Sequence, residues 1–264
     1  MSKLGKSKPP KISIVIPSYN KADFIKETLD SIVSQDYPNL EIIIQDGGST
    51  DGTVDIIKKY AKKHPDMISW SSEKDKGQVD AINKGLKKAT GGVLTFINAD
   101  DVYEKGALRT VGEYFAKDPQ TLWLAGRGKV TNEKGGEISK WVTAYKNFLL
   151  KLNSYNLLLI VNYLMQPSVF LSKEAYRKCG PFVGTWSYVM EYDLWLKIGK
   201  DKMPAFIDRT LSSFRLSGKN ISSTQYNSLL GQDLELAKKY TNNFLVLYLH
   251  FMHNIGRKIV VKSL

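Results

Sequence analysis

The sequence predicts an α/β fold in which a mostly parallel central sheet is flanked by helices. Short apolar runs alternate with segments of helical periodicity through roughly the first hundred residues, as expected of a parallel sheet covered by helices. Polar or acidic side chains follow four of these runs. The length of 264 residues suits one large domain with an elaborated second half.

The first two strands are short apolar runs rich in β-branched residues. They cover residues 12–16, which Pro17 closes, and residues 40–44. Between them, residues 21–34 carry apolar side chains at helical spacing, which predicts an amphipathic helix. Runs of about five apolar residues fit buried strands better than helices, because helices need longer stretches.

Two more strands continue the alternation, at residues 67–70 and 93–97. The helix before the first of them follows a loop rich in turn residues and carries the apolar side chains of Val54, Ile57, Tyr60 and Ala61. Residues 77–89 are predicted to form the helix before the second, again with apolar side chains on one face. Strand and helix therefore alternate through four strands.

The ends of these four strands carry the residues that indicate a site. They are Tyr19 and Asn20 after the first strand, Asp46 after the second, Glu73 and Asp75 after the third, and Asp100 and Asp101 after the fourth. Because parallel strands point the same way, these side chains converge on one edge of the sheet, where open α/β folds bind ligands. Adjacent carboxylates such as Asp100 and Asp101 repel each other unless a cation neutralises them. We therefore expect a site that holds a cation and a ligand.

The pattern changes after a helix predicted at residues 107–115. Residues 122–130 and 137–142 flank a glycine-containing turn, which predicts a β-hairpin. Further along, the sequence predicts a strand at residues 168–171, a helix at 188–198, short strands at 205–207 and 211–214, and a long helix at 223–240.

The net charge of +12 arises from 38 Lys and Arg against 26 Asp and Glu, and it suits acidic ligands, an anionic membrane or nucleic acid. The charge is dispersed and no nucleic-acid-binding motif is present, so we expect no nucleic-acid partner. The single cysteine, Cys179, excludes an intramolecular disulfide and is compatible with a reducing, cytoplasmic location. No signal peptide or spanning helix is expected, and residues 1–10 are predicted to be a basic flexible tail.

Seven motifs resemble those of the family 2 glycosyltransferases, inverting enzymes of the GT-A fold, and occur in the family's order within residues 11–217. They are residues 14–20 (IVIPSYN), 46–53 (DGGSTDGT), 75–77 (DKG), 98–101 (NADD), 166–168 (QPS), 180–182 (GPF) and 190–196 (MEYDLWL). The resemblance implies transfer, with inversion, of a sugar from a nucleoside-diphosphate sugar, a UDP-sugar being favoured, to a saccharide or lipid-linked acceptor. It also implies a divalent metal, Mg²⁺ or Mn²⁺, and a role in polysaccharide, glycolipid or lipid-linked oligosaccharide synthesis.

The resemblance also assigns roles to individual residues. Asp100 occupies the metal-ligand position of the family's DxD motif, and Glu191 occupies the position of the general base. Lys76 could equally be a solvated surface charge, and Gln166 could simply open a strand. The residues expected to contact substrate are Pro17, Ser18, Tyr19, Asn20, Asp46, Lys76, Gly77, Asp101, Gln166, Asp193 and Arg215.

The chemistry of these residue types agrees with the assignment. A diphosphate leaving group gains negative charge, which a hard cation held by Asp100 and phosphate oxygens would stabilise. No His lies within these motifs, which argues against zinc. A positioned carboxylate such as Glu191 could take the proton of the acceptor hydroxyl, typically a contribution of about 10²–10⁴-fold. Arg215 and Lys219 could hold the diphosphate from the other side.

Four departures from the family pattern bear on activity. Gly47 stands where a second acid is usual, Asn98 stands at the first acid of the DxD motif, and Glu191 replaces the commoner Asp. Residues 215–217 (RLS) lack a His found in many relatives. These departures keep open an alternative function, a nucleotide-sugar-binding subunit without transfer activity. The motif at residues 190–196 argues against a third class, the nucleotidyltransferases.

We expect a GT-A domain over residues 11–217, with a nucleotide-binding half at 11–101 and an acceptor half at 102–217. Residues 218–264 are predicted to be a C-terminal helical segment. Its last part, residues 243–264, is aromatic-rich and apolar with a basic flank, which suits the interface of an anionic membrane. The alternative is a helix packed on the domain or on a second subunit, so peripheral membrane attachment and a homo-oligomer both remain open.

Overall fold

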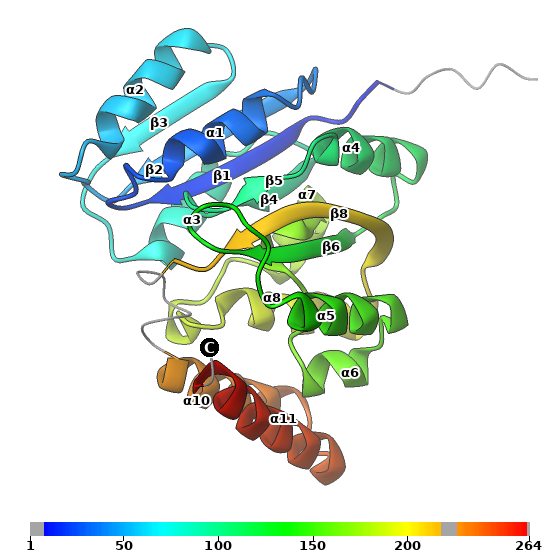
Figure 1. The fold of residues 1–264 in the computed structure, drawn as a ribbon. Coiled ribbons are helices and arrows are strands. Elements are labelled where there is room, and N and C mark those ends of the chain that lie inside the picture. Colours follow the sequence, from blue (N-terminus) through cyan, green and yellow to red (C-terminus); the bar gives the residue numbers. More distant parts are fainter. Residues whose placement is uncertain (1–7, 218–225, 263–264) are drawn as a thin grey trace, which may run out of the picture.

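The computed structural model describes residues 8–217 and 226–262, with the backbone alone at residues 226 and 260–262. A single sheet lies at the centre with helices on both faces, which confirms the predicted α/β class (Figure 1). Its strand order is β3-β2-β1-β4-β7-β6-β8-β5. The strands are β1 (Ile12–Ser18), β2 (Leu40–Asp46), β3 (Ile68–Ser72), β4 (Val93–Phe96), β5 (Val102–Tyr103), β6 (Trp123–Thr131), β7 (Val169–Ser172) and β8 (Ala205–Arg215).

The helices fall between the strands along the chain and gather again at its end. They are α1 (Ile25–Val33), α2 (Thr53–Lys63), α3 (Gln78–Lys88), α4 (Ala107–Lys117), α5 (Lys140–Leu152), α6 (Tyr155–Ile160), α7 (Lys173–Cys179), α8 (Met190–Asp201), α10 (Tyr226–Tyr240) and α11 (Phe244–Lys262). Two 3₁₀ turns, η1 (Gln166–Ser168) and η2 (Gly184–Trp186), precede β7 and α8.

The first four strands are parallel, as the alternation of strands and helices predicts. Ile14 of β1 pairs with Ile42 of β2 on one side and Thr95 of β4 on the other. Successive side chains of a strand point to opposite faces, and both faces of β1 are buried. Ile14 and Ile16 belong to the core beneath α1, α2 and α4, whereas Val15 belongs to the core that α3 covers. The parallel strands therefore end together at one edge, with helices on both faces.

The predicted hairpin after β6 is wrong in its second strand. The turn forms, with Gly135 in the left-handed region at φ +78°. The returning chain makes only an isolated bridge between Thr131 and Glu137 and then enters α5 at Lys140. The reason lies in the neighbours of β6, which pairs with β8 along one edge and with β7 only at residues 123–125 of the other. Farther along that second edge, the side chains of Asn147 and Thr143 on α5 hydrogen-bond the backbone of β6 in place of a hairpin partner.

The two short strands predicted near residue 210 form one long strand, β8. Its parallel pairing with β6 shifts register beside Gly126 and Arg127, which is why the sequence suggests an interruption at Asp208 and Arg209. At its far end, β8 also pairs antiparallel with β5. β5 begins at Val102, directly after Asp101. This pairing therefore places the end of β8 beside the segment that follows β4.

The C-terminal helices pack against α6 and α8 beneath the sheet (Figure 1). α10 matches the described part of the predicted helix at 223–240, whose first three residues lie outside the described residues, as does Lys219. α11 covers most of residues 243–264. In the described part of the chain, no helix combines the length and apolar character needed to cross a bilayer.

Candidate functional site

A pocket of about 540 Å³ opens at the edge where the parallel strands end. Its lining comes from the ends of β1 and β4, the start of α3, η1 and the start of α8. Seven of the residues predicted from the sequence line it, namely Pro17, Ser18, Tyr19, Gly77, Asp100, Gln166 and Glu191. The structure thus brings residues separated by more than 170 positions in the sequence to one cavity. The convergence of the first four strand ends on one edge of the sheet is predicted from the sequence.

Asp100 enters the pocket beside a lysine that the sequence analysis missed. The Lys21 Nζ lies 2.5 Å from the Asp100 Oδ2, and the Asp100 side chain is only 6% exposed. Lys21 follows β1 and is held through its backbone N–H, which donates to the Thr53 Oγ1 at 2.8 Å. Its position directly after Asn20 in the first motif is the signal that could have identified it. The pocket therefore contains a cation and an anion in direct contact.

Asp101 is fully buried and does not line the pocket. Its Oδ1 accepts the backbone N–H of Arg215 at 2.8 Å, and its Oδ2 accepts the Asn98 Nδ2 at 3.2 Å. Burial, and then the negative charge of Asp100, raise the pKa of Asp101 well above its ordinary value. Of the two adjacent carboxylates, Asp100 therefore faces the ligand space, and Asp101 ties the strand end to β8.

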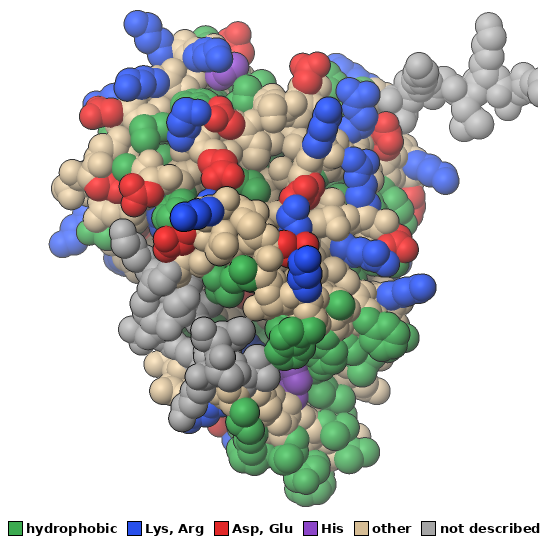
Figure 2. All heavy atoms as spheres, in the orientation of Figure 1, with side chains coloured by type: hydrophobic (Ala, Val, Ile, Leu, Met, Phe, Trp, Pro, Cys, Tyr) green, Lys and Arg blue, Asp and Glu red, His purple; other side chains and the backbone are tan. Residues whose placement is uncertain are grey.

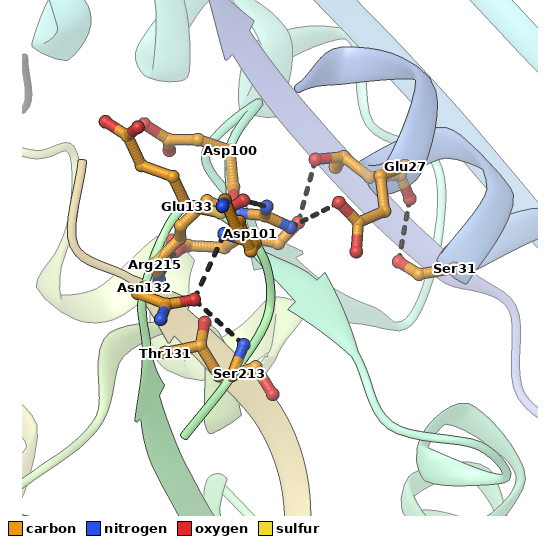
Figure 3. Close-up of polar contacts among 12 residues, drawn as sticks. Glu27, Ser31, Asp100, Asp101, Thr131, Asn132, Glu133, Ser213 and Arg215 are labelled. Atoms are coloured by element: carbon orange, nitrogen blue, oxygen red, sulfur yellow. Dashed lines mark hydrogen bonds and ion pairs between the residues drawn. The ribbon is translucent and has the colours of Figure 1, made fainter. Parts of the chain in front are cut away.

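Arg215 lies behind Asp100 and not in the pocket (Figure 3). Its Nε donates to the Asp100 carbonyl oxygen at 2.8 Å, its Nη1 to the Glu133 carbonyl oxygen at 2.5 Å, and its Nη2 to the Glu27 Oε2 at 2.6 Å. The side chain is 3% exposed. From the end of β8, Arg215 thus joins the turn after β6 and helix α1 to the backbone of Asp100, which it supports from behind.

Asp46 is buried at the end of β2 and holds the following loop. Its Oδ2 accepts the backbone N–H groups of Gly48 and Ser49 at 3.0 and 2.9 Å, and the Ser72 Oγ at 2.6 Å. Gly47 lines the pocket, and a Cβ there would meet the Asp75 Oδ2 at 2.8 Å. A side chain at position 47 would therefore require Asp75 to move, and a carboxylate there would also repel it.

Asn20 and Lys76 border the pocket without lining it. Asn20 adopts a left-handed conformation at φ 49°, and its Oδ1 accepts the backbone N–H of Thr50 at 3.0 Å. The Lys76 backbone N–H donates to the Asp80 Oδ2 at 3.1 Å. Gly77, at φ +102°, then begins α3 at the pocket. These contacts shape the rim of the site.

Gln166 and Ser18 offer polar atoms for a ligand. The Gln166 Nε2 donates to the Phe96 carbonyl oxygen at 2.7 Å, which fixes the amide. The Gln166 Oε1 and the Ser18 Oγ are both buried with no hydrogen-bond partner among the described residues. Buried polar atoms normally have a partner, so these two are available to hydroxyl groups or other donors of a bound molecule.

Glu191 is the second residue of α8 and lines the pocket from that helix. Burial raises its pKa to about 7, against the opposing effects of its own backbone amide and of the positive charge of Lys146. Burial also lowers the pKa of Lys146, on α5, to about 8. Glu191 is therefore a carboxyl group that can exchange a proton near neutral pH.

Asp193 lies on another side of α8 and does not line the pocket. Its carboxylate contacts the Lys197 Nζ at 2.6 Å, the Lys239 Nζ at 3.4 Å and accepts the Tyr240 hydroxyl at 2.7 Å. These partners tie α8 to α10. Asp193 therefore holds the two helices together at the position that the structure gives it.

The pocket's donor set fits a divalent cation that is shared with a diphosphate. The described residues contain no group of three or more His, Cys, Asp or Glu side chains arranged to hold a metal by themselves. Mg²⁺ usually takes one or two carboxylates and fills its other positions with substrate phosphates and water. Asp100 supplies one such carboxylate in the pocket. The Asn98 Oδ1, the neighbouring side-chain oxygen, already accepts a hydrogen bond from the Gln78 Nε2 at 2.6 Å.

Residues 13–180 match the family model described as glycosyl transferase family 2. The chain belongs to glycosyltransferase family 2. This match covers the first five of the seven motifs and ends at Gly180, the first residue of the sixth, and the seventh follows at residues 190–196. The GT-A pocket described above therefore lies in a member of this family.

One relative illustrates this family membership. The chain is 32% identical over 135 residues to the putative teichuronic acid biosynthesis glycosyltransferase TuaG of Bacillus subtilis, and spans about half of its length, 53%. The match covers 51% of this chain.

Two solved structures share its GT-A fold. The mannosyltransferase PcManGT from Pyrobaculum calidifontis, in complex with GDP-Man and Mn²⁺, has a TM-score of 0.71 at 20% identity and covers 98% of this chain and 74% of its own. S. aureus TarS, residues 1–349 with UDP-GlcNAc, has a TM-score of 0.60 at 19% identity and covers 86% and 66%. At these identities, the likeness shows the fold.

Proposed function

We propose that the protein is an inverting glycosyltransferase that moves a sugar from a nucleoside-diphosphate sugar to an acceptor hydroxyl in cell-envelope polysaccharide synthesis. The observation that carries the proposal is that Asp100, at the end of β4, and Glu191, at the start of α8, line one pocket. We assign Asp100 to the leaving diphosphate and Glu191 to the attacking hydroxyl. We assign donor binding to residues 11–101 and acceptor binding to residues 102–217.

The donor side of the pocket would hold the diphosphate by charge. A Mg²⁺ or Mn²⁺ ion bound by Asp100 would supply Lewis-acid stabilisation of the leaving group. Lys21 brings a further positive charge within reach of the same oxygens, because its ammonium group already contacts Asp100. Ser18 and Gln166 have buried oxygens available to donor hydroxyls. We favour a UDP-sugar, the class of donor that is bound to TarS, whereas PcManGT is in complex with GDP-Man.

On the acceptor side, Glu191 would act as the general base. As its carboxylate, it takes the proton of the acceptor hydroxyl while that oxygen forms a bond to the anomeric carbon and the bond to the diphosphate breaks. A single displacement of this kind inverts the anomeric centre. A base whose pKa is near the working pH balances ionisation against proton affinity, and the pKa of about 7 meets that condition.

The acceptor class and the cellular location are part of the proposal. TuaG is described as a putative teichuronic acid biosynthesis enzyme, which supports a saccharide or lipid-linked acceptor of the cell envelope. The free Cys179 suits a reducing compartment, so we place the enzyme in the cytoplasm. A second candidate is a nucleotide-sugar-binding subunit without activity, which the amide of Asn98 at an acid position favours.

One experiment tests the proposal and separates the two candidates. The protein is incubated with a panel of nucleotide sugars and Mn²⁺ or Mg²⁺, and release of the nucleoside diphosphate is followed. We expect Glu191→Gln to lose about 10²–10⁴-fold in turnover while it still binds nucleotide, and Asp100→Asn to lose both turnover and metal-dependent binding. Glu174→Gln, an exposed glutamate on α7, is the matched control and should retain full turnover.

The product reports the stereochemistry. Proton NMR of the product formed from an α-linked donor should show a β-linkage. Retention of configuration, or equal turnover in wild type and Glu191→Gln, would refute the assignment of the base. Donor binding without release for any sugar and acceptor extract would favour the inactive subunit.

A further inference from the structure

Exposed hydrophobic side chains are concentrated on two helices. Among the described residues, fourteen large hydrophobic side chains are exposed, and all except Tyr19 and Trp70 lie on α5 or α11. Scattered single hydrophobic residues are normal on a protein surface, whereas a contiguous patch marks a site of interaction. The question is therefore what these two helices contact.

α5 is turned so that its aromatic side faces outward. Its exposed stripe follows helical spacing and consists of Trp141, Tyr145, Phe148 and Leu152. Much of its inner side is polar: the Thr143 Oγ1 accepts the Val130 N–H at 3.3 Å, and the Asn147 amide donates to and accepts from the Gly128 backbone at 3.0 and 3.3 Å. Leu149 and Leu150 at its end enter the core. An ordinary surface helix has the opposite arrangement.

α11 repeats this inversion. Its buried positions include His250 and Asn254, which hydrogen-bond to each other at 3.0 Å, and the His250 Nδ1 lies 2.8 Å from the Leu159 carbonyl oxygen. One turn later, the Arg257 Nη1 contacts the Asp233 Oδ2 at 2.8 Å. The outward side is apolar, from Phe244, 81% exposed, through Tyr248, Met252 and Ile255 to Ile259, 66% exposed. α11 therefore adheres to the protein by polar contacts and exposes its hydrophobic side.

The two outward faces form one surface. The ring of Tyr145 on α5 stacks on the ring of His253 on α11, with centroids 6.1 Å apart. Figure 2 shows hydrophobic side chains gathered over α5 and continuing down to α11 at the lower end of the molecule. We call this surface, the outward sides of α5 and α11, the apolar face.

The charged side chains that α5 and α11 themselves carry are all of one sign. Neither α5 nor α11 contains an Asp or Glu. Lys140 and Lys151 are exposed on α5, and Lys258 is exposed on α11. Anionic lipid headgroups attract such basic side chains, while Trp, Tyr and Phe suit the boundary between headgroups and acyl chains.

We propose that the apolar face of α5 and α11 binds an anionic lipid surface and holds the enzyme there as a peripheral protein. A symmetric contact with a second copy fits the charges poorly, because it would place the same uncompensated lysines opposite each other. Insertion across the bilayer is not part of the proposal, because α11 keeps one side bonded to α6 and α10. Its apolar side alone enters the interface.

One residue of α5 links the helix that carries the apolar face to Glu191 of the pocket. α5 carries Phe148 outward and, two positions earlier, Lys146 whose charge acts on Glu191. A sugar acceptor carried on a lipid would therefore approach from the side that holds the base. This last step rests on the proposed function, whereas lipid binding itself does not.

Vesicle sedimentation with the full chain tests the proposal without any assay of transfer. We expect the wild type to sediment with vesicles of phosphatidylcholine and phosphatidylglycerol at 70:30, and at least about tenfold less with phosphatidylcholine alone. Trp141→Ser with Phe148→Ser, and separately Phe244→Ser with Tyr248→Ser, should each reduce the partition coefficient by about tenfold or more. The matched control is Trp70→Ser, an exposed aromatic residue outside the apolar face, which should bind as the wild type does.

Tryptophan fluorescence gives an independent measurement. Vesicles with brominated acyl chains should quench the emission of Trp141 on binding. Trp141→Phe should lose most of that quenching and still sediment with the vesicles. This result would show that the quenching reports insertion of Trp141 and not a change in folding. All substituted side chains are exposed, and unchanged thermal unfolding would verify that the variants fold.

Three results would overturn the proposal. One is wild-type sedimentation that both double variants leave unchanged, and another is equal binding to neutral and anionic vesicles. The third is concentration-dependent self-association in the analytical ultracentrifuge that the double variants abolish, in a protein that does not bind vesicles. That result would identify the apolar face as a contact between copies of this chain.

Discussion

The ammonium group of Lys21 contacts the carboxylate of Asp100 directly, with 2.5 Å between the Nζ and the Oδ2. Both side chains line the pocket. In the absence of donor, Lys21 thus neutralises the carboxylate that we assign to the metal. A cation that binds Asp100 must displace the ammonium group, which then becomes available to the diphosphate.

This competition predicts opposite effects of Lys21→Met on two ligands. In the free protein, Mn²⁺ should bind up to roughly fivefold tighter, because an ion pair of this kind contributes up to about 1 kcal/mol. The donor nucleotide should bind more weakly, since a positive charge near the diphosphate is lost. Electron paramagnetic resonance of Mn²⁺ and titration calorimetry with the nucleotide measure the two affinities separately. Weaker binding of Mn²⁺ to the variant would contradict the competition.

The pKa of Glu191 predicts the acid limb of the pH–rate profile. Because the base must be ionised and its pKa is about 7, turnover should fall nearly tenfold per pH unit below pH 7 and level off above about pH 8. Initial rates of nucleoside diphosphate release from pH 5 to 9 measure this profile. A limb centred near 4.5, the ordinary value of a glutamate, would show that the base ionises as an ordinary carboxyl group and would contradict the raised pKa of Glu191.

The same shift predicts a pH-dependent stability. The native pKa of about 7 exceeds the unfolded value of 4.5, so the native state binds the proton more tightly, and this stabilisation is lost as the pH rises toward 7. Glu191→Gln, which stays neutral, should therefore raise the free energy of unfolding at pH 8 by on the order of 2 kcal/mol. The difference should vanish near pH 4, and urea unfolding at the two pH values checks the sign.

Lys146 sets the position of that acid limb. Its charge lowers the pKa of Glu191, so Lys146→Met should move the limb to higher pH, while Lys146→Arg should move it little. Lys151→Met, an exposed lysine on the same helix, is the control and should leave the profile in place. The profile is measured with a soluble donor, by release of the nucleoside diphosphate. If the acid limb of Lys146→Met stays at the wild-type position, the charge of Lys146 does not set the pKa of Glu191.

Arg215 should matter for stability more than for donor contact. Its guanidinium donates to the carbonyl oxygens of Asp100 and Glu133 in a buried place, and removing it leaves acceptors unsatisfied. Arg215→Met should lower the free energy of unfolding by about 2–4 kcal/mol. Arg215→Lys should not restore it, because one ammonium group cannot reproduce the fork of donors. Thermal unfolding measures these changes. The control is Arg109→Met, at an exposed position of α4, which should cost less than about 0.5 kcal/mol.

The sequence predicts those parts of the fold whose signal is local. Each strand of the parallel half is an apolar run between turn residues. Its type and its place along the chain therefore follow from residues 12–97 alone. The second strand of the predicted hairpin fails because β8 pairs along one edge of β6 and side chains of α5 hydrogen-bond its backbone on the other. Which edge of a strand is free depends on the whole sheet, and a local turn does not carry that information.

The site divides in the same way. Glu191 and Asp100 stand in motifs, and the structure brings both to the pocket. Arg215 also follows a strand, yet its side chain turns back toward Glu27 of α1, nearly two hundred residues earlier. Lys21 escapes notice because a lone lysine after a motif resembles any surface charge. Side-chain direction at a strand end is decided by distant partners, so the sequence indicates the neighbourhood of a site better than its lining.

The antiparallel pairing of β4 with β7 joins Val93 to Ser172 and Leu94 to Leu171. The strand that presents Asp100 is therefore laid down against one made some seventy-five residues later in the chain. Until synthesis has passed that point, one edge of β4 stays open to other chains. During translation, the sheet around β4 is therefore completed only after β7 has been made, and chaperone protection in that interval would safeguard the yield of folded protein.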